Sequence, residues 1–163
     1  MKAQSRSFRT LRSFRTLKGI AALVAVGVVM VASPVSAQDW MSPQVRSAAE
    51  HMLSTMPDDY FTIKNVAAEK EIATGFPLVL DVREPSEFVI EHIAKAKNLP
   101  IRILIKTVES LPTDKSAAIL VYCKTGHRGA IALAVLRMLG YSNVRSIYGG
   151  LDGWKAAGFA IAK

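Results

Sequence analysis

Hydrophobic and polar positions along most of the chain follow short repeats that predict a succession of strands and helices. Four candidate strands lie at residues 60–63, 77–82, 117–123 and 143–150. The second and third runs are almost wholly apolar, which is typical of strands buried on both faces of a parallel sheet. Helical segments separate the runs, so the order of elements favours an α/β fold with helices on both faces of the sheet.

Six segments with helical spacing lie between and around these runs, at residues 43–56, 65–74, 84–93, 99–112, 125–141 and 150–159. Ser42 is a candidate N-cap of the first helix, and Pro43 fits its first turn. Asn65 is expected to cap the second helix, which Gly75 ends, and Gly140 is expected to end the fifth. The first helix is expected to pack on the domain through Val45, Ala49, Met52, Leu53 and Met56.

The first 37 residues follow a different pattern, that of a secretory signal peptide. Six basic residues and no acidic residue precede position 20, and an apolar run of 14 residues follows at 19–32. Val35 and Ala37 then form the small-residue pattern that precedes a cleavage point, so cleavage is expected after Ala37, leaving Gln38 at the N-terminus. The apolar run is shorter than the roughly 20 residues that span a bilayer, which makes an uncleaved anchor the less favoured alternative.

Basic residues are concentrated in this leader, which changes the meaning of the net charge. The chain carries a formal charge of +8, and the six basic residues before position 20 supply most of it. The remaining residues are close to neutral, so no nucleic-acid partner is expected. Residues 42–163 contain no Gly/Ser-rich or Pro-rich linker, which predicts a single domain. A Sec-type leader predicts a periplasmic or secreted bacterial protein, without stable membrane insertion after cleavage.

The only cysteine of the chain, Cys123, ends the third of these segments and directly precedes a predicted helix. This position is the carboxyl edge of a parallel sheet, where ligands bind in open α/β folds. The N–H groups of a helix N-terminus and nearby cations favour a thiolate or a bound anion. Cys123 is therefore a candidate nucleophile rather than a buried structural cysteine. The loop expected to bind its substrate contains Lys124, Thr125, Gly126, His127 and Arg128.

Several short motifs, in order along the chain, resemble the rhodanese family. They are LDVREPSEF at 80–88, HI at 92–93, NLP at 98–100, VYCKTGHR at 121–128, LGY at 139–141, NV at 143–144 and GGLDGW at 149–154. The resemblance covers nearly the whole of residues 42–163. It implies a single rhodanese-like domain, with a five-stranded parallel sheet flanked by helices on both faces and the cysteine loop as the active site.

The resemblance also implies a reaction, because members of this family are sulfurtransferases. They pass sulfane sulfur through a persulfide on the loop cysteine, here Cys123, and they need neither a metal nor an organic cofactor. The implied partners are a small anionic sulfur donor such as thiosulfate and an acceptor that is cyanide or a thiol. The absence of a second cysteine agrees with such a role, since a partner thiol would trap Cys123 as a disulfide.

Other polar and aromatic residues are given supporting or structural roles. Asp81, Arg83 and Glu84 end a predicted strand and are candidates for substrate contact, but the resemblance implies a mainly structural role, in which Asp81 and Arg83 support the site through hydrogen bonds and ion pairs. His92 is expected to bond a turn, and the side chain of His127 is expected to face solvent. Trp40 and Trp154 are expected to pack. No Cys/His set has the spacing of metal ligands, so no metal site is predicted.

The chain departs from the family pattern at three positions. Glu91 and Lys95 stand where the family usually has Gly, so the turn between them is expected to be reshaped. Gly129 stands where Ser is frequent after the loop arginine. These departures keep open a non-catalytic rhodanese-like module that binds sulfur or a partner. A thiol redox or phosphatase-like enzyme is a third hypothesis. It is disfavoured because four residues separate Cys123 from Arg128, whereas cysteine phosphatases have five.

Overall fold

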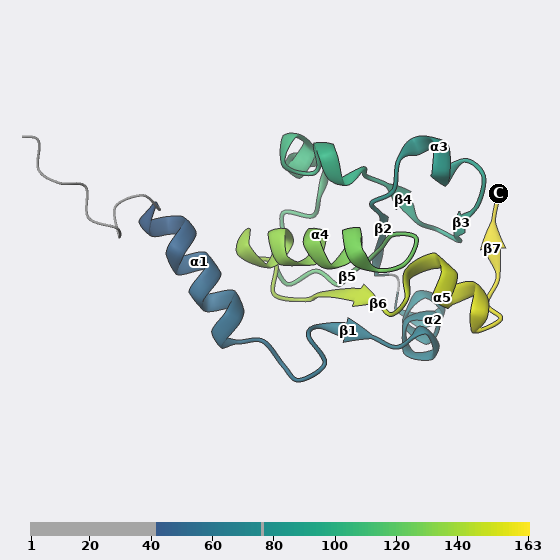
Figure 1. The fold of residues 1–163 in the computed structure, drawn as a ribbon, viewed down its shortest axis with the longest axis horizontal. Helices are drawn as coiled ribbons and strands as arrows, with labels where there is room; N and C mark the ends of the chain where they lie inside the picture. The colour runs from purple at the N-terminus through teal and green to yellow at the C-terminus, as the bar shows by residue number, and fades with distance from the viewer. Residues whose placement is uncertain (1–41, 76) are drawn as a thin grey trace, which may run out of the picture. The chain divides into compact units, whose positions relative to one another are not determined.

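A five-stranded parallel sheet forms the centre of the molecule, as expected (Figure 1). The computed structural model describes residues 42–75 and 77–163, which belong to one compact unit. The strands of the sheet lie in the order β1-β6-β5-β2-β4 and all pairs are parallel. They are β1 (Thr62–Ile63), β2 (Leu78–Asp81), β4 (Lys97–Asn98), β5 (Ile119–Tyr122) and β6 (Val144–Ile147). The predicted leader, its cleavage point and Trp40 lie outside the described residues.

Helices cover both faces of this sheet, and a small second sheet lies beside it. The helices are α1 (Pro43–Ser54), α2 (Asn65–Thr74), α3 (Pro85–Phe88), α4 (His127–Met138) and α5 (Gly150–Ala156), with the 3-10 segments η1 (Ile101–Ile103) and η2 (Ile105–Ser110). The second sheet pairs β3 (His92–Ile93) antiparallel with β7 (Ile161–Ala162). None of the helices in residues 42–75 and 77–163 is both long enough and apolar enough to cross a membrane.

The central strands send alternate side chains to two separate hydrophobic cores. On one face Val121 packs with Leu133 and Leu136 of α4. On the other face Leu120 packs with side chains of α2 and α5, among them Trp154. Period-two alternation along a strand produces this division, because neighbouring residues point to opposite faces. The expectation that helices cover both faces and that Trp154 packs is confirmed.

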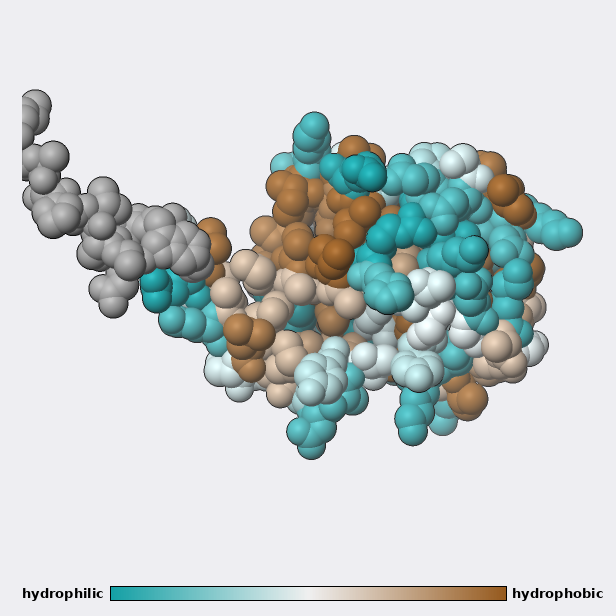
Figure 2. All heavy atoms as spheres, viewed as in Figure 1, coloured by the Kyte–Doolittle hydropathy of each residue, from teal (hydrophilic) through white to brown (hydrophobic). Residues whose placement is uncertain are grey.

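The first helix forms as expected but is packed less closely than expected. The Val45 N–H donates to Ser42 Oγ at 3.2 Å, which confirms Ser42 as the N-cap, and Pro43 lies in the first turn. No residue of α1 is buried, and Val45 and Leu53 are exposed. Met56, just beyond the helix, is half-buried against the core that α4 covers. The apolar stripe is therefore only partly covered, and Figure 2 shows further hydrophobic surface over α4 and the 3-10 segments.

Two local expectations are wrong. Lys64, not Asn65, is the N-cap of α2, because the chain stays extended through Lys64 at the end of β1. Asn65 is instead the first helical residue, and its buried Oδ1 has no hydrogen-bond partner. The segment 99–112 forms the two 3-10 segments rather than an α-helix, with a break at Thr107. Gly140 ends α4 as expected, in the left-handed conformation at φ 89° that glycine adopts most readily.

Lys95 occupies a backbone conformation that normally favours glycine. Its φ is 65°, and its Nζ donates to the Ile72 carbonyl at 3.4 Å. Lys95 thus adopts a conformation that glycine adopts readily, whereas the φ of Glu91 is not positive. A left-handed conformation costs a residue with a β-carbon on the order of 1 kcal/mol.

Replacing Lys95 by Gly should therefore stabilise the fold relative to replacing it by Ala. Both variants lose the lysine side chain, and only Lys95→Gly removes the backbone cost. We expect Lys95→Gly to have a free energy of unfolding about 0.5–1 kcal/mol higher than that of Lys95→Ala. Urea unfolding of the two variants measures the difference, and an alanine variant as stable as the glycine variant would contradict it.

Candidate active site

Cys123 lies at the base of a tight loop between β5 and α4. Its residue surface is 1% exposed, and its Sγ accepts a hydrogen bond from the Gly126 N–H at 3.2 Å. Gly126 is the N-cap of α4 and has a φ of 105°, a conformation that suits glycine. The loop therefore turns back over the sulfur and directs a backbone N–H at it.

The first turn of α4 adds further hydrogen-bond donors around this loop. The N–H groups of a first helical turn have no partner within the helix, and here that turn begins at His127. Lys124 and Thr125 are exposed, and Thr125 Oγ1 lies 3.0 Å from His127 Nδ1. The His127 side chain is exposed, as expected. The loop thus combines a buried sulfur with a polar, accessible rim that can hold a small anion.

Arg128 forms an ion pair with Glu87, a residue that was not predicted to belong to the site. Its two terminal nitrogens donate to Glu87 of α3 at 2.6 and 2.9 Å. The hydrogen bonds of Arg128 lower the pKa of Glu87 to about 2. Glu87 in turn raises the pKa of Arg128, to which the nearby Cys123 adds. The positive charge of Arg128, near Cys123, is therefore balanced by the carboxylate of Glu87.

Backbone N–H groups at the N-terminus of α5 donate hydrogen bonds to the start of the cysteine loop. The Leu151 N–H donates to the Cys123 carbonyl at 2.8 Å, and the Asp152 N–H donates to the Lys124 carbonyl at 2.9 Å. Gly150, at a φ of 59°, permits this contact, because a β-carbon there would lie 2.4 Å from the Cys123 carbonyl oxygen. Backbone groups therefore fix where the strand ends and the loop begins.

Asp81 and Arg83 form a buried ion pair next to this loop rather than inside it. Arg83 Nε donates to both carboxylate oxygens of Asp81, at 3.0 and 2.9 Å. A terminal nitrogen of Arg83 donates to Asp81 and to the Glu91 carbonyl, each at 2.6 Å. Asp81 also lies near the Tyr122 hydroxyl, whose pKa is raised mainly by burial and further by the Asp81 charge. The pair thus joins the end of β2 to the turn before β3.

His92 and Glu91 complete that turn. His92 Nδ1 lies 3.0 Å from the Phe88 carbonyl, and the two rings stack at 3.9 Å, so His92 bonds the turn as expected. Glu91 accepts from Lys155 Nζ at 2.8 Å and therefore links the turn to α5.

At the third position that departs from the family pattern, a β-carbon on Gly129 would lie 3.1 Å from Ser146 Oγ. The buried Ser146 therefore occupies the space beside Gly129.

A small pocket of about 160 Å³ opens beside the cysteine loop. It is lined by Arg83, Glu87, Ile90, Glu91, Lys124, Leu151 and Asp152. The sequence motifs predicted that the loop residues would meet, but Glu87 and Ile90 come from α3 and the turn after it. Their place at the same sheet edge follows from the end of β2, which the DVRE stretch marks.

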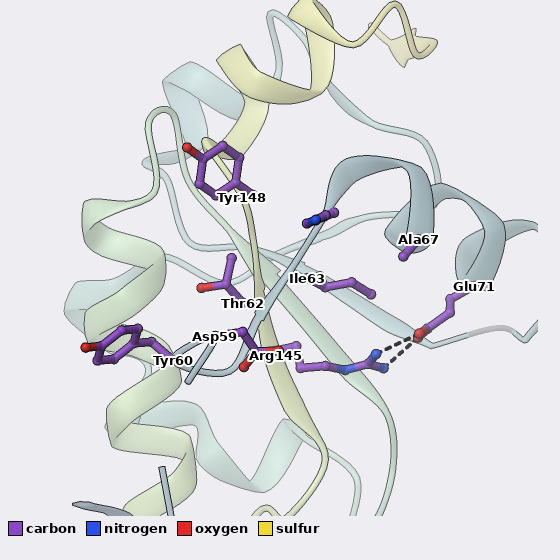
Figure 3. A pocket seen from close by; sticks show the side chains of 9 residues that line it. Asp59, Tyr60, Thr62, Ile63, Ala67, Glu71, Arg145 and Tyr148 are labelled. Carbon is purple, nitrogen blue, oxygen red and sulfur yellow. Dashed lines mark hydrogen bonds and ion pairs between the residues drawn. The ribbon is translucent and has the colours of Figure 1, made fainter. Parts of the chain in front are cut away.

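A larger hollow of about 590 Å³ lies at the free edge of β1 and is shown in Figure 3. Tyr60 and Tyr148 lie at its rim, and Arg145 reaches across to Glu71 with two hydrogen bonds of 2.6 Å. Its lining contains neither Cys nor His. Within residues 42–75 and 77–163, no three His, Cys, Asp or Glu side chains are grouped so as to hold a metal ion.

The comparison with known families agrees with this geometry. Residues 65–157, more than half of the chain, match the rhodanese-like domain. The chain belongs to the rhodanese-like domain family. A rhodanese-related protein from Thermoplasma volcanium has the same fold, with a TM-score of 0.57 and 32% sequence identity. That likeness covers 62% of this chain and 96% of the Thermoplasma chain.

Curated relatives of this rhodanese-like protein include sulfurtransferases. It is 32% identical over 70 residues to the thiosulfate sulfurtransferase PspE of Escherichia coli, covering 43% of this chain and 67% of that protein. It is 31% identical over 84 residues to a sulfurtransferase of Allochromatium vinosum, covering 52% and 77% respectively. The chain spans about half or less of longer relatives from Synechocystis (47%), Ogataea parapolymorpha (31%) and Mycobacterium tuberculosis (19%).

Gly150→Ala should displace the cysteine loop. The added β-carbon would overlap the Cys123 and Lys124 carbonyls, at 2.4 and 2.7 Å, in a left-handed conformation. We expect a loss of about 2–4 kcal/mol in the free energy of unfolding and at least a tenfold loss of reactivity of Cys123. Reaction with a thiol reagent and urea unfolding measure the two effects.

The matched control for that variant is Gly158→Ala. Gly158 also has a positive φ, of 79°, but a β-carbon there would meet nothing within 4 Å. It should lose only about 1 kcal/mol and keep the reactivity of Cys123. Equal reactivity of Cys123 in the two variants would show that the Gly150 contact does not position the loop.

Glu87→Gln should change how stability depends on pH. The lowered pKa of Glu87 means that its ion pair stabilises the fold fully above about pH 4.5, and this contribution is lost as the pH falls toward 2. Because both side chains are about one third exposed, we expect the variant to be on the order of 1 kcal/mol less stable at neutral pH. The difference should shrink as the pH falls from about 4.5 toward 2.

Urea unfolding at several pH values tests this, with Glu109→Gln as the control. Glu109 is exposed and makes no ion pair among the described residues. A gap between Glu87→Gln and the wild type that stays constant with pH would mean that the charge of Glu87 is not what stabilises the pair.

Proposed function

We propose that this protein is an exported sulfurtransferase that carries sulfane sulfur as a persulfide on Cys123. The observation that carries the proposal is the cysteine loop, in which a buried sulfur accepts a hydrogen bond from Gly126 at the N-terminus of α4. Relatives described as sulfurtransferases, one of them a thiosulfate sulfurtransferase, support the reaction class. Thiosulfate is the proposed donor, and cyanide or a thiol is the proposed acceptor.

In the first half-reaction, the Cys123 thiolate attacks the outer sulfur of the donor. A new S–S bond forms on Cys123, the S–S bond of thiosulfate breaks, and sulfite leaves with its electron pair. The thiol proton has been lost to solvent beforehand, so charge is conserved. The product is a persulfide anion whose outer sulfur lies within the loop, where N–H groups of the loop and the first turn of α4 stabilise it.

Lys124 and Arg128 have different roles in this scheme. The charge of Arg128 is balanced by its ion pair with Glu87. Arg128 therefore stabilises the conformation of the loop more than it attracts the donor. Lys124 is exposed and lines the pocket, and among the described residues no ion pair includes it. Lys124 is therefore the cation available to guide an anionic donor toward Cys123.

In the second half-reaction, an acceptor nucleophile attacks the outer sulfur of the persulfide. The S–S bond on Cys123 breaks, the thiolate is regenerated, and the acceptor leaves as thiocyanate or as a new persulfide. This step needs no external oxidant or reductant, because the sulfur atom passes from one nucleophile to another. The only cysteine of the chain is Cys123, so the protein offers no second thiol that would divert the persulfide into an internal disulfide.

The predicted signal peptide at residues 1–37 is the basis for proposing that the protein is exported. Cleavage after Ala37 would release a mature chain beginning at Gln38 into the bacterial periplasm or the medium. The intact mass of the protein recovered from the cell envelope tests this part, because it would correspond to residues 38–163.

The purified mature chain should gain one sulfur atom when it is incubated with thiosulfate. Intact mass spectrometry detects the gain, a reducing thiol should remove it, and Cys123→Ser should show none. Turnover is then measured as thiocyanate formed from cyanide. A folded protein with reduced Cys123 that gains no sulfur from thiosulfate or another sulfane donor would overturn the proposal. A persulfide that forms but never transfers would identify a sulfur-binding module.

A further inference from the structure

One edge of the central sheet is open, and its backbone groups face away from the rest of the sheet. β1 is the first strand in the order β1-β6-β5-β2-β4, so β6 covers only one of its two sides. The Phe61 and Ile63 carbonyls accept hydrogen bonds from β6 on that side. Because successive residues of a strand turn their backbone groups to opposite sides, Thr62 and Lys64 face the open side.

Two of the four backbone groups on the open side are already bonded within the chain. The Thr62 N–H donates to the Asp59 carbonyl at 2.9 Å. The Lys64 carbonyl accepts from the Ala68 N–H at 3.0 Å. The Thr62 carbonyl and the Lys64 N–H bond to no backbone group in the described part of the chain. Ile63 thus lies between one free acceptor and one free donor at the edge of the sheet.

This arrangement of backbone groups is complementary to a second copy of itself. When two copies pair antiparallel with Ile63 opposite Ile63, the Lys64 N–H of each copy meets the Thr62 carbonyl of the other. The pairing therefore supplies two backbone hydrogen bonds and satisfies all four free groups. A two-fold dimer requires such self-complementarity, because the same patch must serve both partners. The two five-stranded sheets then join at their open edges.

The side chains around Ile63 are complementary across the same axis. Asp59 and Lys64 are exposed, carry opposite charges and lie on opposite sides of Ile63 along the chain. Neither belongs to an ion pair among the residues that the structure describes. The two-fold rotation brings Lys64 of one copy toward the Asp59 end of the other strand. Tyr60 and Val66, which are 69% and 71% exposed, are brought toward each other in the same way.

The hollow of about 590 Å³ beside β1 leaves this edge accessible to another chain (Figure 3). Thr62 and Lys64, the two residues with free backbone groups, are among those that line it. Tyr60 and Tyr148 stand at its rim with about two thirds of their surfaces exposed, 69% and 66%. Tyr60 also has a φ of 54°, a conformation that is unfavourable for a residue with a β-carbon. Aromatic surface therefore surrounds the free backbone groups, and pairing would bury it.

We propose that the open edge of β1 joins two copies of this chain in a two-fold dimer, with the two β1 strands antiparallel. This inference goes beyond the proposed function and is independent of it, because it uses no residue of the cysteine loop. Two backbone hydrogen bonds and a short strand give a reversible dimer, which forms as the concentration rises from about 10 µM to 1 mM. Pairing also covers an edge strand that would otherwise be free to pair with other chains.

Lys64→Pro removes the free donor without breaking a hydrogen bond inside the chain. Proline has no N–H, and the φ of Lys64, −68°, already has the value that proline adopts. Ile63 is in a strand, the conformation that the residue before a proline prefers. Lys64→Ala is the matched control, because it loses the same side chain and keeps the N–H. Thermal unfolding of the two variants checks that both are folded.

Sedimentation equilibrium of the mature chain, from about 10 µM to 1 mM, measures the dissociation constant of the dimer. The wild type should pass from monomer to dimer over this range. Lys64→Ala should weaken the dimer by about threefold, through the lost charge. Lys64→Pro should weaken it by about a further tenfold, because both backbone hydrogen bonds are lost. Ile131→Ser changes an apolar residue of α4 that is 58% exposed, and it should keep the wild-type dissociation constant.

The comparison of these variants decides whether the edge of β1 forms the dimer. A chain that stays monomeric at about 1 mM would overturn the proposal. Equal dissociation constants for Lys64→Pro and Lys64→Ala would overturn it too, since the backbone of β1 would then take no part. A dimer that Ile131→Ser weakens and Lys64→Pro leaves intact would place the contact on the surface of α4 instead. The supporting result is a loss specific to Lys64→Pro, in a variant that unfolds at the same temperature as Lys64→Ala.

Discussion

The buried ion pair between Asp81 and Arg83 is the interaction on which the site depends. Asp81 is fully buried and Arg83 nearly so. Burial alone would lower the pKa of Arg83, but the hydrogen bonds and charge of Asp81 outweigh it and raise the pKa. Removing one member of such a pair strands the other charge and costs about 3–5 kcal/mol, so the chain must keep both. The pair therefore holds together the segments that bond to it.

The segments that bond to this ion pair are the ones that surround the cysteine loop, and they form its frame. Asn98 at the end of β4 donates to the Asp81 and Arg83 carbonyls, at 3.1 and 2.9 Å, which ties β4 to β2. Arg83 holds the turn after α3 through the Glu91 carbonyl. Once that turn is fixed, α3 presents Glu87 to the loop arginine. A charge pair outside the reacting centre thus determines where the groups inside it lie.

The sequence predicted the parts of this frame that extend over many residues. The apolar runs around Leu80 and Val121 are long enough for their pattern to be unambiguous, and Gly140 ends α4 for a local reason. By contrast, β4 and the β3–β7 pair have two residues per strand, too few to show a period. Asn65 is not the cap because the backbone stays extended through Lys64, just beyond β1, a tertiary effect that local preference does not contain.

The same distinction applies to the candidate site. Cys123 and the loop residues were found because they are contiguous, whereas Glu87 reaches Arg128 across 41 positions of the chain. That contact changes the chemistry expected of the loop. Glu87 takes one N–H from each terminal nitrogen of Arg128 and balances its charge, so this arginine attracts an anion less strongly than an unpaired arginine would. Lys124 and the backbone N–H groups of the loop and of the first turn of α4 therefore remain as the donors that can meet an anion beside Cys123.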